Sequence, residues 1–260
     1  MTLTRVALAT ALALGGCAGV PARPRVPFPT EYVAPTDDAY QRWYERMRDG
    51  RVLERLAGTL AFLRLPVPLT LRLDQCGESN AWYDGDEHVA TFCYEWLDEL
   101  VRDSPSRVDE DGITREATIV GPVIFLYLHE IGHAVIDILK LPVLGREEDA
   151  ADQLATMILL RLDPHGADGT LGAAARMFAR SAKGQVPDAS DLADPHPLDG
   201  QRYYNLLCLA YGSHPADHAE AAGGDDVLPP DRAEECEREY QQVAHAVREL
   251  LHFAPEPERP

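Results

Sequence analysis

One apolar segment, residues 123–139, constrains the fold more than any other part of the chain. It predicts a single buried helix that carries His129, Glu130 and His133 in the spacing H-E-x-x-H. Residues four apart on a helix project from one face, so both imidazoles can reach the same ion. In this pattern two histidines bind Zn²⁺, and the glutamate stands near the bound water as a general base. Gly132 lets another group approach the backbone between the two histidines.

A catalytic zinc ion needs three protein ligands, so another part of the chain must supply the third. A second helix is predicted at residues 146–162, directly after the tight connection Leu-Pro-Val-Leu-Gly. Glu148 and Asp152 are four apart on it and share a face, which suits one ligand and one carboxylate that fixes a histidine tautomer. Glu147 is the rival ligand, and a solvated acidic first turn is the third interpretation.

The order H-E-x-x-H and then E-x-x-A-D resembles the gluzincin metallopeptidases, such as thermolysin and the group of CAAX prenyl proteases and heat-shock membrane proteases. The resemblance implies that His129, His133 and Glu148 hold zinc. It implies that Glu130 is the general base and that Asp152 orients a zinc-bound histidine. The fold class expected is α+β and mostly helical, zincin-like, with a small sheet upstream of an active-site helix hairpin. The short spacing between His133 and Glu148 implies that this hairpin is tight.

Residues 196–202 give a third match, H-P-x-x-x-x-R, which is similar to a downstream segment of the prenyl-protease group. Attack on an amide needs hydrogen-bond donors where the oxyanion forms, and His196, Arg202, Tyr203 and Tyr204 are candidates for that catalytic role. In the alternative, Arg202 pairs with a carboxylate beneath the site and His196 caps a helix. Both interpretations stay open at this point.

A wider resemblance, from about residue 37 to residue 253, is to a bacterial family of metallopeptidases of unknown function. It is carried by Cys76 with Asn80-Ala81, by Cys93-Tyr94-Glu95, by the HEIGH helix with its continuation LPVLGREEDAADQ, and by HPLDGQRYYNLLC. Unlike the prenyl-protease group, this family has no transmembrane helices, which argues against a substrate embedded in the membrane.

The first 16 residues predict an export signal, with one basic residue before a short apolar run. Leu14-Gly15-Gly16-Cys17 resembles the bacterial lipobox, which implies cleavage before Cys17 and lipidation of its thiol. The expected location is the cell envelope, on the periplasmic side and at the outer membrane. An ordinary signal peptide with an incidental cysteine is the alternative. A Pro-rich tether at residues 17–36, a zincin-like domain at 37–253 and a tail at 254–260 complete the expected organisation.

Four cysteines remain after Cys17, and four allow three connectivities. Export places them in an oxidising compartment, where disulfides persist. We expect the pairs Cys76–Cys93 and Cys208–Cys236, because each brackets one local unit. A second zinc site is the rival, but the chain has no C-x-x-C spacing to support it.

The rest of the chain predicts helices around a small sheet. Asn80 to Tyr83 is the candidate edge strand beside the motif helix, where an extended peptide can pair. Pro122 is expected in the first turn of the motif helix. The expected helices are at residues 37–65 (broken near Asp49-Gly50), 94–101, 170–183, 198–211 and 232–253, the strands at 69–73, 80–83 and 88–93, and a loop at 185–197.

The composition suits one sizeable globular domain, with 45% hydrophobic and 26% charged residues. The net charge of -19 argues against nucleic acid or an anionic membrane surface as the main partner. The sequence therefore predicts a lipid-anchored zinc metallopeptidase with a peptide or protein substrate. A zinc-stabilised binding lipoprotein without turnover is the alternative, and a metal-free scaffold is a third. Glu130 favours the enzyme, because a purely structural site needs no base.

Overall fold

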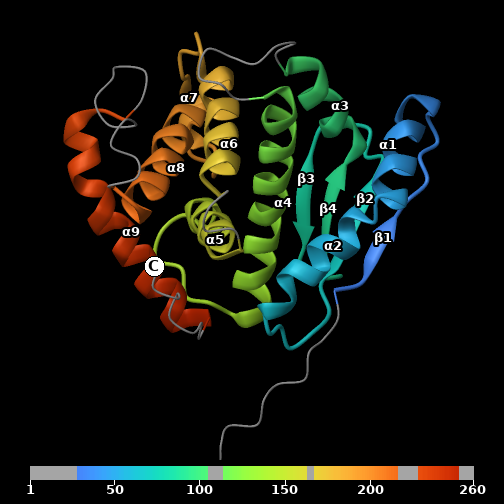
Figure 1. The fold of residues 1–260 in the computed structure, drawn as a ribbon, viewed down its shortest axis with the longest axis horizontal. Helices are drawn as coiled ribbons and strands as arrows, with labels where there is room; N and C mark the ends of the chain where they lie inside the picture. Colours follow the sequence, from blue (N-terminus) through green and yellow to red (C-terminus); the bar gives the residue numbers. More distant parts are fainter. Residues whose placement is uncertain (1–27, 105–113, 163–166, 216–227, 252–260) are drawn as a thin grey trace, which may run out of the picture.

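A central helix, α4 (Arg115–Leu139), separates a small sheet from a layer of helices in the computed structural model (Figure 1). The structure describes residues 28–104, 114–162, 167–215 and 228–251. The predicted export signal, Cys17 and the tail at 254–260 lie outside the described residues. The expected α+β class, mostly helical with a small sheet, is confirmed.

Within the described residues the sheet has four strands, in the order β1-β2-β4-β3. Strand β2 (Thr70–Asp74) lies parallel to β1 (Thr30–Tyr32) and to β4 (Val89–Cys93), whereas β3 (Ala81–Asp84) is antiparallel to β4 and forms an edge. Strand β1 lies within residues 17–36, where we expected a tether. The prediction is wrong for residues 30–32, because they belong to the sheet. Three residues are too few to show an alternating pattern, so pairing with β2 rather than local sequence defines them.

One face of the sheet packs on α4. Every residue of β4 is buried, and Phe92 stacks on Trp96 of α3 (Tyr94–Asp103) and contacts the ring of Tyr127 from α4. The hydroxyl of Tyr127 lies 3.1 Å from the carbonyl oxygens of Arg72 and Ala90. These contacts fix α4 against the middle of the sheet and leave β3 at the edge.

The helices at the N-terminal end confirm the predicted break near Gly50. Helix α1 (Asp38–Asp49) ends there, and α2 (Val52–Thr59) follows after Arg51, which adopts a left-handed conformation with φ of 50°. A short 3₁₀ turn, η1 (Leu60–Phe62), leads to β2. Trp43, Leu53 and Leu60 from these elements are buried in the core.

Helix α4 starts earlier than its sequence suggests. Its N-cap is Thr114, whose side chain accepts a hydrogen bond from the backbone N–H of Ala117. Pro122 therefore lies inside the helix and not in its first turn, which corrects the prediction. A proline there removes one backbone hydrogen bond of the helix. By length and composition α4 could cross a membrane, yet 67% of its most apolar window is buried inside this protein.

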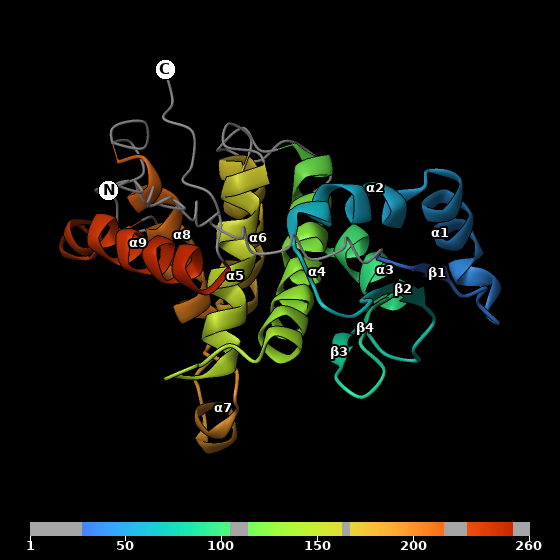
Figure 2. The ribbon, with the colours of Figure 1, turned by 90° about the horizontal axis from the view of Figure 1, so that it is seen from below.

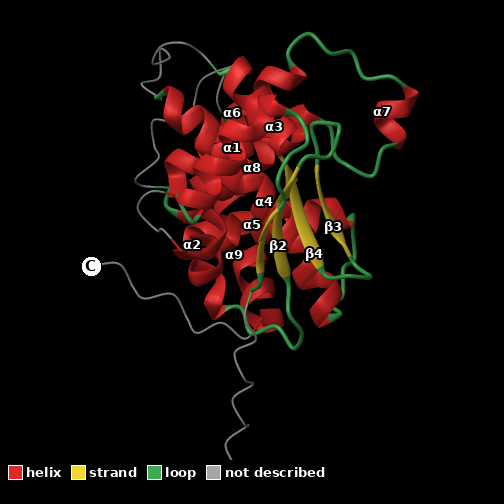
Figure 3. Cartoon of the chain, turned by 90° about the vertical axis from the view of Figure 1, so that its right-hand side faces the viewer, coloured by secondary structure: helices red, strands yellow, loops and turns green. Residues whose placement is uncertain are grey.

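The helices after α4 form the second layer, and Figure 2 shows α4 between them and the sheet. Helix α7 (Ala189–Ala193) interrupts the segment that we expected to be a loop at residues 185–197 (Figure 3). Asp188 caps this helix, and its side chain accepts hydrogen bonds from two backbone N–H groups of the first turn. The elements are α5 (Glu147–Leu162), α6 (Ala167–Ala182), α7 (Ala189–Ala193), α8 (Asp199–Ser213) and α9 (Pro230–Leu251).

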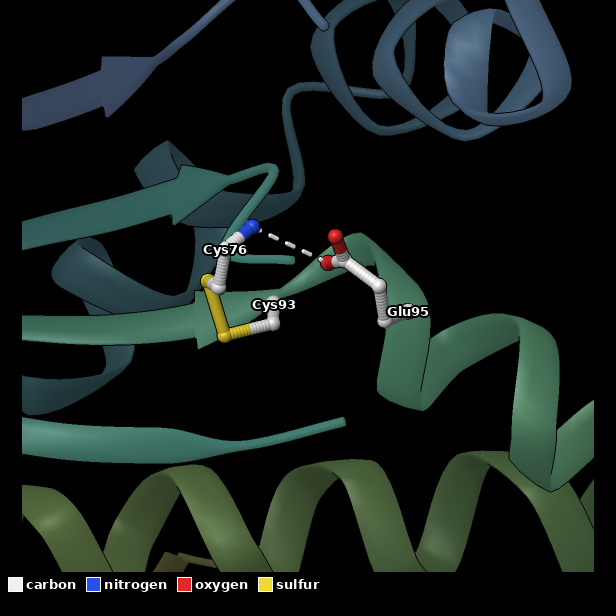
Figure 4. Close-up of side chains that lie close together, drawn as sticks. All are labelled: Cys76, Cys93 and Glu95. Carbon is white, nitrogen blue, oxygen red and sulfur yellow. Dashed lines mark hydrogen bonds between the residues drawn. A yellow bond between two sulfur atoms is a disulfide. The ribbon is translucent and has the colours of Figure 1, made fainter. Parts of the chain in front are cut away.

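Two disulfides pair the cysteines as expected. Cys76–Cys93 joins the segment after β2 to the end of β4, with a Cα–Cα distance of 5.6 Å (Figure 4). Glu95 accepts hydrogen bonds from the backbone N–H groups of Cys76 and Gly77 at 3.1 and 2.7 Å, so both of its carboxylate oxygens are hydrogen-bonded. Cys208–Cys236 joins α8 to α9.

Candidate metal centre

A tight helix hairpin brings the predicted ligands together. Helix α4 ends at Lys140, which has a left-handed backbone with φ of 52°, and α5 begins at Glu147. The two helices pack closely where Gly132 faces Ala151. A Cβ added at Gly132 would lie 3.0 Å from the backbone oxygen of Ala151, so glycine permits this approach. The hairpin therefore places the start of α5 over the histidines of α4.

The donor atoms of His129, His133 and Glu148 face one another. Nε2 of His129 lies 3.2 Å from Nε2 of His133 and 3.1 Å from Oε2 of Glu148. The distance from Nε2 of His133 to the same oxygen is 3.3 Å. The three predicted ligands thus form a triangle with nearly equal sides.

This triangle has the dimensions of a metal site. Two ligands bound at about 2.0–2.1 Å to a tetrahedral ion lie about 3.3 Å apart, close to all three distances. Nitrogen and carboxylate oxygen are also donors that zinc accepts. The donor atoms and their spacing therefore fit a divalent ion.

A carboxylate stands behind each of these imidazoles. Oδ1 of Asp152 is 2.8 Å from Nδ1 of His129, and Oε1 of Glu147 is 2.8 Å from Nδ1 of His133. A carboxylate at Nδ1 holds the proton on that nitrogen and leaves Nε2 to bind a metal. Asp152 thus contacts the ring of His129, and its role of orienting a metal-bound histidine stays a prediction. Glu147 contacts His133 from behind, and Glu148 supplies the oxygen that both Nε2 atoms face.

Arg202 of α8 lies beneath this centre. Its Nε and Nη2 donate to Oδ2 and Oδ1 of Asp152 at 2.9 and 2.7 Å, and its guanidinium stacks over Phe178 of α6. Both side chains of the pair are buried. This is the second of the two placements that the sequence left open for Arg202.

His196 approaches the centre from the segment between α7 and α8. Its Nε2 lies 3.1 Å from Oε2 of Glu148, and its Nδ1 lies 2.9 Å from Oδ1 of Asp194. The N-cap of α8 is Leu198, so His196 does not cap this helix. Asp194 had no signal in the sequence beyond its place two residues before His196.

The charges of the site favour a cation. Burial would raise the pKa of Glu148, but hydrogen bonds from His129, His133 and His196 outweigh it and hold the pKa well below the usual range. Burial lowers the pKa of His133, but the carboxylates of Glu148 and Glu147 outweigh it and raise the pKa to about 9. Carboxylates that stabilise a protonated imidazole also stabilise a metal ion bound in place of the proton.

Glu130 lies on α4 between the two histidines and is 9% exposed. Burial raises the pKa of its carboxyl group. The charges of His129 and His133 oppose that rise, so the carboxylate lies within electrostatic reach of both imidazoles. A carboxylate with a raised pKa next to a metal centre is suited to accept and return a proton.

A polar clamp attaches the edge strand to α4. The hydroxyl of Tyr83 in β3 donates to Oδ2 of Asp137 at 2.8 Å, one helical turn after His133, and Lys140 pairs with the other oxygen at 2.7 Å. Nδ1 of His88 lies 2.7 Å from the same hydroxyl. Burial and Asp137 raise the pKa of Tyr83, so the hydroxyl stays protonated. The clamp keeps β3 beside the motif helix, as the sequence predicted.

The fold and the site together place two histidines and a glutamate that could bind a metal ion on one helix hairpin, with the buried carboxylate of Glu130 on the same helix. Residues 32–251 match the family DUF4344, described as "Putative metallopeptidase", and the chain belongs to this family. No curated protein and no solved structure is similar enough to the chain to match it.

Proposed function

We propose that the protein is a zinc-dependent peptidase with a zincin-like active site. His129, His133 and Glu148 would hold the ion, because their donor atoms lie 3.1–3.3 Å apart around one point. A bound zinc ion supplies Lewis-acid chemistry, which lowers the pKa of water and polarises a peptide carbonyl. This convergence of donor atoms is the observation that carries the proposal.

Residues of the chain would transfer the proton and orient the ligands. Glu130 accepts the proton of the attacking water and passes it to the departing amine, a role that its raised pKa supports. Asp152 and Glu147 hold the imidazoles of His129 and His133 in the tautomer that presents Nε2. We assign Arg202 a positioning role, because it contacts Asp152.

The substrate we propose is an extended peptide or protein segment. Strand β3 is an edge of the described sheet, and its pairing partner there is β4. The clamp of Tyr83 on Asp137 holds that edge next to the helix that carries Glu130. A peptide that adds to a sheet edge forms backbone hydrogen bonds that do not depend on its side chains.

Export and a lipid anchor belong to the same proposal. The sequence at residues 1–17 supports them, and both disulfides are compatible with an oxidising compartment. The enzyme would then act on the periplasmic side of the bacterial envelope, held at the outer membrane by the lipid on Cys17.

A binding lipoprotein with a structural zinc ion is the second candidate. The observation that favours it is His196, since a site closed by four protein ligands is typical of structural zinc. Glu130 favours the enzyme, because a structural site does not need a buried carboxylate beside its ligands. The two candidates differ in turnover.

A peptide-library cleavage assay with purified zinc-loaded protein tests the proposal. The wild type should cleave, and Glu130→Gln should retain zinc but lose activity by about 100-fold or more, since general bases contribute at that level. Glu116→Gln is a matched control, because Glu116 is exposed on the same helix. Full activity in Glu130→Gln would contradict the mechanism, and a zinc-loaded wild type that cleaves no peptide would favour the binding lipoprotein.

A further inference from the structure

His196 repeats the arrangement of the two histidines on α4. Nε2 of His196 and Nε2 of His129 each lie 3.1 Å from Oε2 of Glu148. On the other side of the ring, Nδ1 of His196 is 2.9 Å from Asp194, as Nδ1 of His129 is 2.8 Å from Asp152. A histidine whose Nδ1 is held by a carboxylate presents Nε2 as a metal donor.

The donor atoms of His129, Glu148 and His196 all lie within 4.8 Å of one another. The rings of His129 and His196 stack with centroids 6.4 Å apart and an interplanar angle of 29°. Nε2 of His133 contacts the same His129 and Glu148 atoms, at 3.2 and 3.3 Å, so the two groups of three donors share two members. Three imidazoles and one carboxylate, drawn onto one ion, would complete a tetrahedral site without water.

The three imidazoles differ in exposure. The side chains of His129 and its partner Asp152 are 5% and 10% exposed, whereas those of His196 and Asp194 are 50% and 52% exposed. His133 is intermediate at 14%. His129 lies on a long buried helix, whereas His196 lies in an irregular segment between two helices. Of the three, His196 is therefore the imidazole that can leave the site without disturbing the core.

A cavity next to His196 has room for its imidazole ring. It has a volume of about 860 Å³ and is lined by His196, Pro197, Asp194 and Asp191 among others. Pro197 restricts the backbone of the residue before it, and Nη1 of Arg146 lies 3.4 Å from the carbonyl oxygen of His196. Both features hold the backbone at His196, so rotation of the side chain is the movement that would take the ring toward the cavity.

We propose that His196 is a displaceable fourth ligand of the metal ion, which closes the site in the resting protein. The proposal rests on the proposed function, because it requires zinc at His129, His133 and Glu148. A catalytic zinc ion needs an open position. The substrate would open it by displacing the imidazole into the cavity, where Asp194 and Asp191 provide acceptors. Resting protein would then be protected from hydrolysing peptides that cannot displace the ring.

X-ray absorption at the zinc edge tests the closed state, because it counts imidazole ligands without any activity measurement. Zinc-loaded full-length wild type should show three imidazoles and His196→Ala two. His245→Ala, which removes an exposed histidine of α9, should still show three. Two imidazoles in a stoichiometrically loaded wild type would overturn this proposal and leave the proposed function standing. A wild type that binds no zinc would overturn both.

Acetohydroxamate, a small zinc-binding probe, tests displacement. At a saturating concentration, the probe should lower the number of zinc-bound imidazoles seen by X-ray absorption from three to two in wild type and leave it at two in His196→Ala. An imidazole count that stays at three with the probe bound would overturn displacement.

Asp194→Asn should weaken zinc binding by about 10-fold or more, as loss of a carboxylate behind a ligating histidine does. It should have no effect in the His196→Ala background, and an undiminished effect there would show that Asp194 acts on the site without His196.

Discussion

Arg202 and Asp152 form a buried pair in which two guanidinium nitrogens donate to the two carboxylate oxygens, at 2.9 and 2.7 Å. The same carboxylate is 2.8 Å from Nδ1 of His129. The pair therefore connects α8 to α5 and, through His129, to α4. Arg202, from the H-P-x-x-x-x-R segment, thus contacts the candidate metal centre through the carboxylate of Asp152.

Arg202→Ala should lower the free energy of unfolding by about 3–5 kcal/mol, because it removes the guanidinium partner of a buried carboxylate and leaves Asp152 with His129 alone. Arg202→Lys should recover part of the loss, since an ammonium group restores the charge but not the two-pronged contact. Urea unfolding of zinc-free protein measures both. A loss below about 1 kcal/mol in Arg202→Ala would show that the pair is not needed for the packing of α8.

Asp152→Asn should weaken zinc binding by about 10–100-fold, because an amide holds the Nδ1 proton of His129 less firmly than a carboxylate. Glu147→Gln should have a smaller effect, since the Glu147 side chain is 54% exposed and water can replace it. Competition with a chelator of known affinity gives both constants. Equal losses of zinc affinity in the two variants would contradict the expectation that the buried carboxylate matters more than the exposed one.

Gly132→Ala should destabilise the protein and weaken zinc binding, because the added Cβ would lie 3.0 Å from the Ala151 backbone oxygen and push α5 away from α4. Gly58→Ala in α2 is the control, since a Cβ there meets nothing within 4 Å. It should raise stability by about 0.5–1 kcal/mol, as alanine does in an exposed helix. Thermal unfolding with and without zinc separates the two effects. An unchanged zinc affinity in Gly132→Ala would mean that the hairpin tolerates a wider spacing.

Tyr32 makes stability depend on pH in the alkaline range. Its hydroxyl donates to Glu54 at 2.7 Å and accepts from the N–H of Leu53 at 2.8 Å. Burial, followed by the bond to Glu54, raises its pKa from 10 to about 12. The folded protein thus keeps this proton where the unfolded chain loses it. The contribution to stability is complete below pH 10 and is lost between pH 10 and 12.

Tyr32→Phe should cost about 1–3 kcal/mol at neutral pH, because the N–H of Leu53 loses its acceptor. The difference between wild type and Tyr32→Phe should shrink as the pH rises from 10 to 12. Denaturant unfolding at a series of pH values shows this directly. A difference that stays constant over that range would mean that Tyr32 ionises equally easily in both states.

Much of the candidate site could be predicted from local sequence, because helical spacing determines which of its residues share a face. His129, Glu130 and His133 share one helix, and Glu148 and Asp152 share the next, so periodicity alone places each group on one face. The tight connection between the helices then leaves few ways to bring those faces together. The disulfide pairs followed from similarly short separations in the chain.

Contacts between distant elements could not be predicted in this way. Whether Glu147 or Glu148 meets the histidines depends on the rotation of α5, which Gly132 and Ala151 set by packing. The contact of His196 with Glu148 depends on how α8 sits against α5. Strand β1 was missed because its pairing with β2, and not its own pattern, makes it a strand.

The zinc content of tag-free protein tests the central claim most directly. Wild type and Glu130→Gln, loaded with zinc and dialysed, should each hold one zinc ion per chain by mass spectrometry. The double variant His129→Ala/His133→Ala should hold none while both disulfides stay intact. A wild type without stoichiometric zinc, or a double variant that keeps it, would contradict the assignment of this helix hairpin as the metal centre.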